Sequence, residues 1–167
     1  MSHVAAKNPI AWAQEALSAE QVRTVTEKNR YIGYPYTKSM NSILAVDMGA
    51  SVVMTTVGKA RELGVDSSQW IYLRGGVDLN DIWHISERPG LHESPAIRLG
   101  WSKLSEATGV DIDEVTDFDL YSCFPCAVQV TCNEIGLSAQ DRRGVTVTGG
   151  LPYMGGPGNN YSLHGIA

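Results

Sequence analysis

Short apolar runs that end in glycine pairs constrain the fold of this chain more than any other feature of its sequence. Gly75-Gly76 and Gly149-Gly150 each close a β-rich run, and Gly155-Gly156 follows a few residues later. Tight glycine turns of this kind stand at strand ends in α/β proteins, because glycine adopts backbone conformations that other residues avoid. The pattern therefore predicts strands that alternate with helices.

The predicted elements follow that alternation through most of the chain. Strands are expected over 50–57, 70–73, 118–121 and 145–148. Helices are expected over 59–63, 94–108 and 125–135, and Gly64, Gly109 and Gly136 end them. Strand, helix and strand in succession predict right-handed crossovers and a mainly parallel sheet.

The two ends of the chain are predicted to be helical. Asn8-Pro9 is typical of a helix start, with apolar side chains on one face at Ile10, Ala13, Ala16 and Leu17. Ser18 and Gln21 form a capping box for a second short helix, in which Val22 and Val25 are expected to face inward. An ordered loop over 29–47 is expected to lead into a helix near 40–46, and a last helix follows Pro157.

Composition and charge exclude several classes of protein. With 167 residues, 43% of them hydrophobic and 19% charged, the chain is a globular domain, and it shows no internal repeat. The net charge is −5 and no basic cluster is present, which argues against nucleic acid and anionic membranes as partners. No apolar run is long enough to span a membrane and the first residues do not resemble a signal peptide, so we expect a cytoplasmic protein.

Cysteines provide one candidate for redox chemistry. Cys123 and Cys126 stand between a predicted strand and a predicted helix, the position at which thioredoxin-like proteins activate a thiol. The residues that follow lack the strands such a domain needs, so we expect Cys126 to be buried and structural and Cys132 to lie in the core. No spacing of Cys and His fits a zinc site, and no metal is expected.

The glycine-rich loop over 149–160 is the second candidate site. Its spacing fits neither a dinucleotide fingerprint nor a P-loop. It offers backbone that a ligand can approach closely and a helix start at Pro157, which are ingredients of a site for a carbonyl oxygen. Glycines chosen only for packing explain the same residues equally well.

Several ordered segments give the chain a resemblance to the thiolase superfamily, in particular to the C-terminal half of sterol-carrier-protein-type and thiolase-like acetyl-CoA acetyltransferases. They are 8–9 leading to 30–38, then 46–54, 59–64, 119–124 and 146–150 onward. The segment Asp119-Leu120-Tyr121-Ser122-Cys123-Phe124 resembles the Asn-Glu-Ala-Phe or His-Asp-Cys-Phe motif of that family, and the loop from Gly149 resembles the approach to its Gly-His-Pro motif.

The resemblance implies a site, residue by residue. Tyr121 falls on the Asn or His of the first motif, Cys123 on its Ala or Cys and Phe124 on its Phe, while Gly156 falls on the histidine of the second. Glycine cannot take a proton, so Tyr121 or His164 is expected to replace the missing base. The catalytic candidates are Tyr121, Cys123 and His164, and the substrate-binding candidates are Gly149, Gly150, Gly155, Gly156, Pro157, Asn159 and Phe124.

The fold expected from the resemblance is an incomplete thiolase-like α/β fold. Residues 1–48 would form a helical and loop segment, 49–68 the last strand and helix of the N-terminal half-domain, and 69–167 a truncated C-terminal half-domain. The regions that hold the family's acylated cysteine and its late cysteine have no counterpart here, so the chain alone is expected to be inactive.

The resemblance also implies an activity and partners. We expect a thiolase-like acyltransferase that forms or cleaves C–C bonds on CoA thioesters, with no bound cofactor and the CoA thioester as substrate. A homo-oligomer, or a partner subunit that supplies missing catalytic residues, is expected. A non-catalytic CoA-ester-binding relative is the alternative, and a thiol-disulfide oxidoreductase that uses Cys123 and Cys126 is a third.

Overall fold

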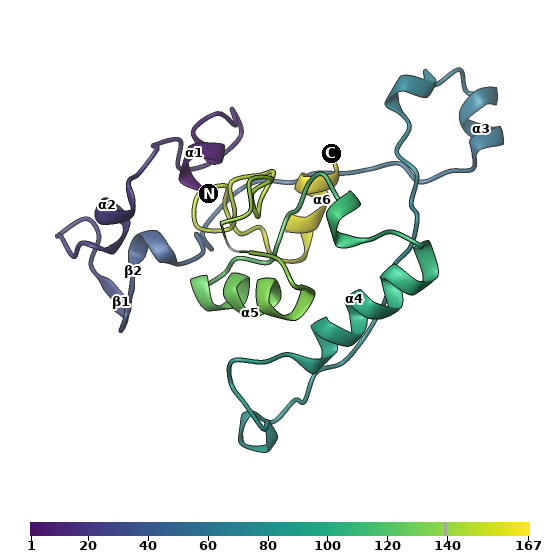
Figure 1. Ribbon diagram of the computed structural model, residues 1–167. Helices are drawn as coiled ribbons and strands as arrows, with labels where there is room; N and C mark the ends of the chain where they lie inside the picture. Colours follow the sequence, from purple (N-terminus) through teal and green to yellow (C-terminus); the bar gives the residue numbers. More distant parts are fainter. Residues whose placement is uncertain (139) are drawn as a thin grey trace.

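The computed structural model describes residues 1–138 and 140–167 and contains several short helices and one small sheet (Figure 1). The α-helices are α1 (Ser2–Ala5), α2 (Ala19–Arg23), α3 (Val57–Glu62), α4 (Pro95–Thr108), α5 (Pro125–Ile135) and α6 (Tyr161–Ile166). Single 3-10 turns are η1 (Lys38–Met40), η2 (Ser67–Gln69), η3 (Ile85–Glu87), η4 (Ile112–Glu114) and η5 (Gly158–Asn160). The strands β1 (Tyr31–Gly33) and β2 (Tyr36–Thr37) pair antiparallel, with Tyr31 opposite Thr37.

Helices with local start and stop signals lie where the sequence predicts them. The Ser94 side chain caps α4, and Gly109 ends it with a φ of 70°. Pro125 opens α5 and Gly136 ends it with a φ of 72°. The predicted capping box at Ser18 is also present at the start of α2. These signals need no long-range partner, because each satisfies backbone groups within one turn of the helix end.

The helix predicted after Asn8-Pro9 is wrong. The Asn8 side chain accepts a hydrogen bond from the Ile10 amide and forms a turn there. The amides of Trp12 and Ala13 then donate to the carbonyls of Met154 and Tyr153. Because these amides are used by a segment far along the chain, no helical ladder forms.

The helix predicted near 40–46 is also wrong, for the same reason. The Ser42 and Ile43 amides donate to the carbonyls of Cys123 and Leu151. Residues 41–56 therefore run as extended chain from the body of the molecule to α3 (Figure 1).

Val25, which was expected to face inward in the helix after Ser18, is exposed, so that prediction is wrong.

The structure does not confirm the predicted parallel sheet. Within the described residues, β1 and β2 are the only strands. One backbone hydrogen bond, from Leu120 to Val145, joins two of the predicted strands, and no described backbone hydrogen bond involves 51–55 or 71–80. A strand is defined by its partner, and these segments are extended without one.

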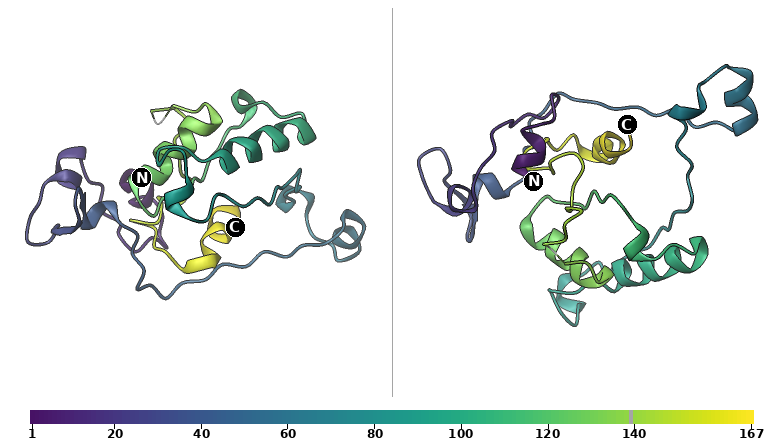
Figure 2. Two further views of the ribbon diagram at one scale, coloured as in Figure 1. Left: turned by 90° about the horizontal axis from the view of Figure 1, so that it is seen from below. Right: turned by 45° about the horizontal axis from the view of Figure 1, so that its top comes forward.

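Two apolar clusters hold the chain together. One gathers Ala5, Ala11, Leu151, Tyr153, Met154 and Tyr161 around the glycine-rich loop. The other packs Phe118 and Leu137 against Val128 and Cys132 of α5, so Cys132 is a core residue as predicted. The α4 helix lies against α5 (Figure 2), where Arg98 of α4 pairs with Glu134 of α5 at 2.6 Å. Within the segment over 49–93, α3 and the chain around it lie away from this body, as both views of Figure 2 show.

Candidate functional site

The turn that enters α5 carries three of the predicted site residues. Phe124 is the N-cap of α5, with extended backbone at φ −140° and ψ 154°, and Pro125 occupies the first turn. Proline fixes the backbone there without removing a needed donor. Tyr121 and Cys123 are placed immediately before the cap, so this short turn sets the positions of both side chains.

Ser122 links that turn to the glycine-rich loop. Its side chain is buried, and its hydroxyl accepts a hydrogen bond from the Leu151 amide at 3.0 Å. The neighbouring Cys123 carbonyl accepts from the Ser42 amide at 3.2 Å. The turn is thus tied to the glycine-rich loop and to the segment before residue 50.

Tyr121 and Cys123 are the two predicted catalytic residues of the turn. Tyr121 is 63% exposed, while Cys123 is partly buried. Hydrogen bonding with the Cys123 thiol, with burial adding to it, raises the pKa of Tyr121. The phenol is protonated at neutral pH, as in an ordinary tyrosine, and can donate a hydrogen bond to a ligand.

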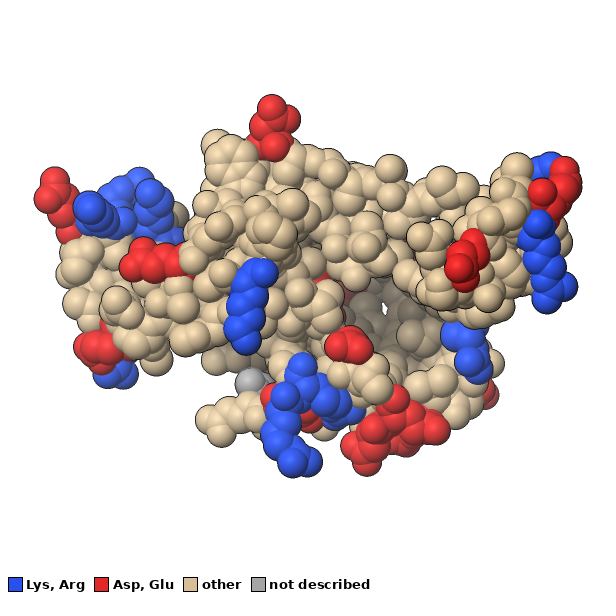
Figure 3. Space-filling model, turned by 90° about the horizontal axis from the view of Figure 1, so that it is seen from above, with Lys and Arg blue, Asp and Glu red and all other residues tan. Residues whose placement is uncertain are grey.

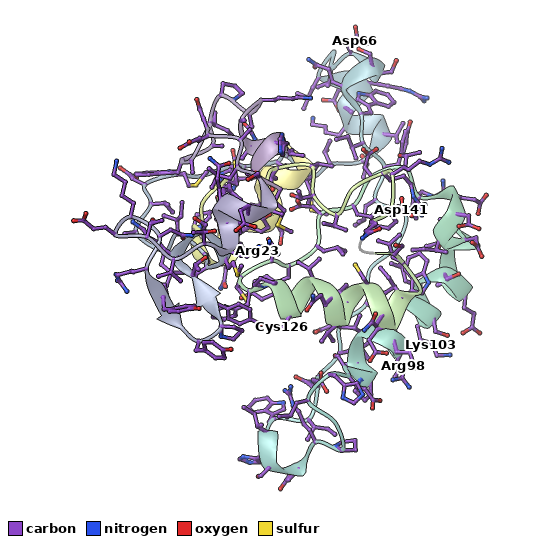
Figure 4. All side chains as sticks on the ribbon, turned by 60° about the vertical axis from the view of Figure 1, so that its left-hand side comes forward. Arg23, Asp66, Arg98, Lys103, Cys126 and Asp141 are labelled. Atoms are coloured by element: carbon purple, nitrogen blue, oxygen red, sulfur yellow. The ribbon has the colours of Figure 1, made fainter. Side chains whose placement is uncertain are left out.

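The second thiol of the turn faces another tyrosine. Hydrogen bonding with Cys126 raises the pKa of Tyr36, and the ring of Tyr36 stacks on Phe124 with 5.8 Å between centroids. Figure 4 shows Cys126 at the start of α5, on the side of the β1–β2 hairpin. Cys126 is exposed, so the prediction that it is buried is wrong. All three cysteines are free thiols.

Residues 149–156 of the glycine-rich loop are buried and pack against the protein's own side chains. A Cβ on Gly149 would lie 2.5 Å from the Cβ of Ala5, and one on Gly155 would lie 2.8 Å from the Met48 sulfur. Both glycines have a positive φ, 113° and 118°. The packing explanation therefore accounts for these two positions without a ligand.

Gly150 and Gly156 are equally enclosed. A Cβ on Gly150 would lie 2.8 Å from the Met1 sulfur. The Ser42 hydroxyl occupies the space where a side chain on Gly156 would begin, and this hydroxyl is buried without a hydrogen-bond partner. Any side chain at position 156, including the histidine that the resemblance would place there, would therefore require Ser42 to move.

A buried polar network supports the loop. Asp119 accepts hydrogen bonds at Oδ1 from Thr146 Oγ1 at 2.7 Å and Thr148 Oγ1 at 3.0 Å. The Tyr161 hydroxyl lies 2.8 Å from Thr148 Oγ1, and burial raises the pKa of Tyr161. Satisfied buried networks fix a unique local geometry, since any missing partner leaves a costly unpaired group.

The remaining predicted site residues lie around α6. Pro157 is half-buried and Asn159 is exposed. Nδ1 of His164 lies 3.1 Å from the Asn160 carbonyl oxygen, one turn earlier. Tyr121 and Cys123 share the turn before α5, whereas His164 lies on α6 and no described hydrogen bond joins it to either of them.

Sequence reasoning missed three residues that shape this region. Asn160 holds the backbone of Ala50 twice, accepting from its amide at 2.7 Å and donating to its carbonyl at 2.9 Å. Asp119 and Ser42 also received no predicted role from the sequence. Asp119 follows a buried Phe118 inside the family-like motif, and a carboxylate in such a run is the signal that points to a polar network.

In the described part of the chain, no group of three or more His, Cys, Asp or Glu side chains is arranged to hold a metal ion. None of the described helices is both long and apolar enough to cross a lipid bilayer.

Comparison with known proteins shows one solved structure that this chain resembles over nearly its whole length. No family model and no curated protein matches the chain. Among solved structures, the chain is similar to a monomeric SCP2-thiolase-like protein, type 1, from Mycobacterium smegmatis, with 42% sequence identity and a TM-score of 0.85. The match covers 99% of this chain and 36% of that chain. The fold is therefore that of part of an SCP2-thiolase-like protein, and the chain spans about a third of the length of the protein it matches.

Proposed function

We propose that this chain, similar in sequence and fold to part of an SCP2-thiolase-like protein, contributes a site for acyl transfer, or C–C bond formation or cleavage, on CoA thioesters. The observation that carries the proposal is the 42% identity over 99% of the chain. The matched chain includes the turn from Tyr121 to Phe124, where the family resemblance predicts catalytic residues. Substrate, activity and partners are all part of this proposal.

In this proposal, Tyr121 acts as a hydrogen-bond or proton donor to the thioester, and not as the base that the sequence predicts in place of the histidine. Like any tyrosine, Tyr121 is protonated at neutral pH, and its raised pKa makes the phenol hold that proton more tightly, which suits a hydrogen-bond donor. Attack on a thioester carbonyl pushes electrons onto the carbonyl oxygen, and a donor aimed at that oxygen stabilises the charge. The Cys123 thiol beside Tyr121 holds the phenol in place, while Ser122 fixes the backbone between them.

A non-catalytic CoA-ester-binding protein is the second candidate. The observation in its favour is that Ser42 fills the space at Gly156, so no side chain there takes a proton. Such a protein keeps the fold and binds the thioester without converting it. Turnover separates the two candidates.

Tyr121→Phe tests the acyl-transfer proposal. We expect thioester turnover by the native assembly to fall by about 10²- to 10⁴-fold, the usual contribution of a general acid or base, while acetyl-CoA binding is unchanged. Tyr34→Phe is the matched control, because Tyr34 is 87% exposed in the hairpin turn. If Tyr121→Phe retains full turnover, Tyr121 is not the acid. If the unmodified assembly binds acetyl-CoA without turnover, the second candidate replaces the first.

A dithiol activity has its own test. If the chain is a thiol-disulfide oxidoreductase, Cys126→Ser should abolish its disulfide-exchange activity. If the acyl-transfer proposal holds, the same substitution should leave thioester turnover intact. Loss of insulin disulfide reduction in that variant, together with an absence of thioester chemistry, would favour the oxidoreductase hypothesis.

A further inference from the structure

Asp119 is a titratable side chain that the proposed function leaves unused. It lies between Phe118 and Leu120, which line the hollow that Figure 3 shows from above as a largely uncharged depression. The hydrogen bonds of Asp119 are made to the glycine-rich loop and to α6, as expected where neighbouring side chains alternate in direction. No described ion pair involves its carboxylate, so hydroxyl and amide groups satisfy the charge.

Donors from several positions converge on one oxygen of the Asp119 carboxylate. Oδ1 accepts from Thr146 Oγ1 at 2.7 Å, from Thr148 Oγ1 at 3.0 Å and from the Val147 amide at 3.2 Å. The Tyr161 hydroxyl lies 3.5 Å from the same oxygen. The three hydroxyl-bearing residues are buried, so loss of the acceptor that they share would leave hydroxyl groups unpaired inside the protein.

The acceptor fixes the direction of the hydrogen bonds that continue into the glycine-rich loop. A threonine hydroxyl has a single proton, and Thr146 and Thr148 both donate theirs to Asp119. Their oxygens are then left to accept, and they do so from the Gly149 amide at 3.0 Å and from the Gly150 amide at 3.2 Å. Asp119 therefore determines, through two threonines, how the backbone of the loop is held.

The network reaches Ser122, which lies between Tyr121 and Cys123. The Leu151 amide follows the two held glycines along the chain and donates to the Ser122 hydroxyl at 3.0 Å. The Tyr161 hydroxyl also hydrogen-bonds with Ser122, which works against the rise in the pKa of Tyr161 that burial causes. Because Ser122 is only 1% exposed, both connections lie inside the protein and act on the turn from its buried side.

We propose that Asp119 is a positioning residue, which holds Tyr121 and Cys123 in their relative arrangement through Thr148 and Ser122. Asp119 touches no reacting atom in this inference. Its chemical consequence rests on the proposed function, in which the Tyr121 phenol is aimed at a thioester carbonyl. The positioning itself is measured without turnover.

A purely structural role predicts a different pattern of loosening. If Asp119 only stabilises the fold, its removal loosens the second apolar cluster, around Cys132, as well as the turn. If Asp119 positions the turn, the change is confined to Cys123. The three free thiols separate these cases, because Cys123 is partly buried in the turn, Cys126 is exposed and Cys132 is buried in that cluster.

Alkylation by iodoacetamide, followed at each cysteine by peptide mass spectrometry of the native protein, tests the inference. In Asp119→Ala we expect Cys123 to react about 10-fold faster, because release of the turn exposes its thiol and breaks its hydrogen bonding with Tyr121. Cys126 should react at an unchanged rate, and Cys132 should stay protected.

Three further variants make the test specific. Asp117→Ala is the matched control, since Asp117 is exposed and its one described hydrogen bond comes from the neighbouring Thr116, and it should leave all three rates unchanged. Thr148→Val removes the hydroxyl between the carboxylate and the loop and should accelerate Cys123 as Asp119→Ala does. Thr148→Ser restores a hydroxyl and should return the rate to that of the unmodified protein. If Asp119→Ala does not fold, Thr148→Val decides.

The outcomes separate this inference from the proposed function. An unchanged Cys123 rate in Thr148→Val overturns the inference, and so does an acceleration in that variant that Cys132 shares. Selective release of Cys123 in a protein that turns over no thioester supports the inference and counts against the proposed function only. Where turnover is present, kcat should fall in Thr148→Val while KM for acetyl-CoA is unchanged, and Thr148→Ser should recover it. A fall in kcat without release of Cys123 counts against this inference only.

Discussion

Gly149→Ala is the substitution whose cost the structure determines most directly. Gly149 has a φ of 113°, and an added Cβ would lie 2.5 Å from the Ala5 Cβ and 2.8 Å from the Ala5 Cα. The backbone conformation costs an alanine about 1–2 kcal/mol. The overlap with α1 adds about 1–3 kcal/mol, because part of the neighbour is backbone and cannot turn aside. We therefore expect a loss of about 2–5 kcal/mol in the free energy of unfolding.

Urea denaturation followed by circular dichroism measures this loss of stability. Alanine substitutions at two other glycines separate the backbone cost from the packing cost. Gly144→Ala meets a φ of 79° with nothing within 4 Å, so it should show the backbone cost alone. Gly76→Ala meets neither obstacle and should change stability by less than about 1 kcal/mol. In the Gly149→Ala background, Ala5→Gly should recover part of the lost stability. If Gly149→Ala costs no more than Gly144→Ala, the packing explanation for the glycine-rich loop is refuted.

Two further predictions concern polar contacts. Asn160→Ala should lower the free energy of unfolding by about 1–3 kcal/mol, because it leaves the Ala50 amide and carbonyl without partners. Asn159→Ala, at the exposed neighbouring position, is the control and should change the free energy of unfolding by less than about 0.5 kcal/mol. Urea denaturation measures both. The Arg143 guanidinium holds the pKa of Asp141 well below its ordinary value of 3.8, so this pair stabilises the fold above pH 3.8 and the stabilisation is lost as the pH falls below it toward the lowered pKa. Asp141→Asn should therefore reduce the difference in urea midpoint between pH 7 and pH 3, and an unchanged difference would contradict the assignment.

Elements that depend on local signals were predictable from the sequence. Ser94, Pro95 and Gly109 delimit α4 within a residue, because a side-chain cap, a fixed φ and a left-handed glycine act inside a single helical turn. The same is true of the capping box at Ser18. Apolar periodicity also placed Cys132 correctly in the core.

Elements that depend on distant partners were not predictable. The amides of Trp12 and Ala13 bond to carbonyls more than 100 positions later in the chain, and no local pattern around Asn8-Pro9 reveals that. The run over 50–57 has strand composition, yet composition does not state which strand pairs with it. At the site, the Gly156 position was found by resemblance, whereas the Ser42 hydroxyl that fills its space became visible only in three dimensions.

The contacts that hold the turn before α5 come from two distant parts of the chain. The Ser42 amide donates to the Cys123 carbonyl, and the Leu151 amide donates to the Ser122 hydroxyl. The geometry of the turn is therefore set by the segment before residue 50 and by the glycine-rich loop. Asn160 joins the same two regions at a second point. Its side chain accepts from the Ala50 amide and donates to the Ala50 carbonyl, and its carbonyl oxygen lies 3.1 Å from Nδ1 of His164 on α6. The segment that leads to α3 is thus tied to the start of the helix that carries His164, the one predicted catalytic residue outside the turn.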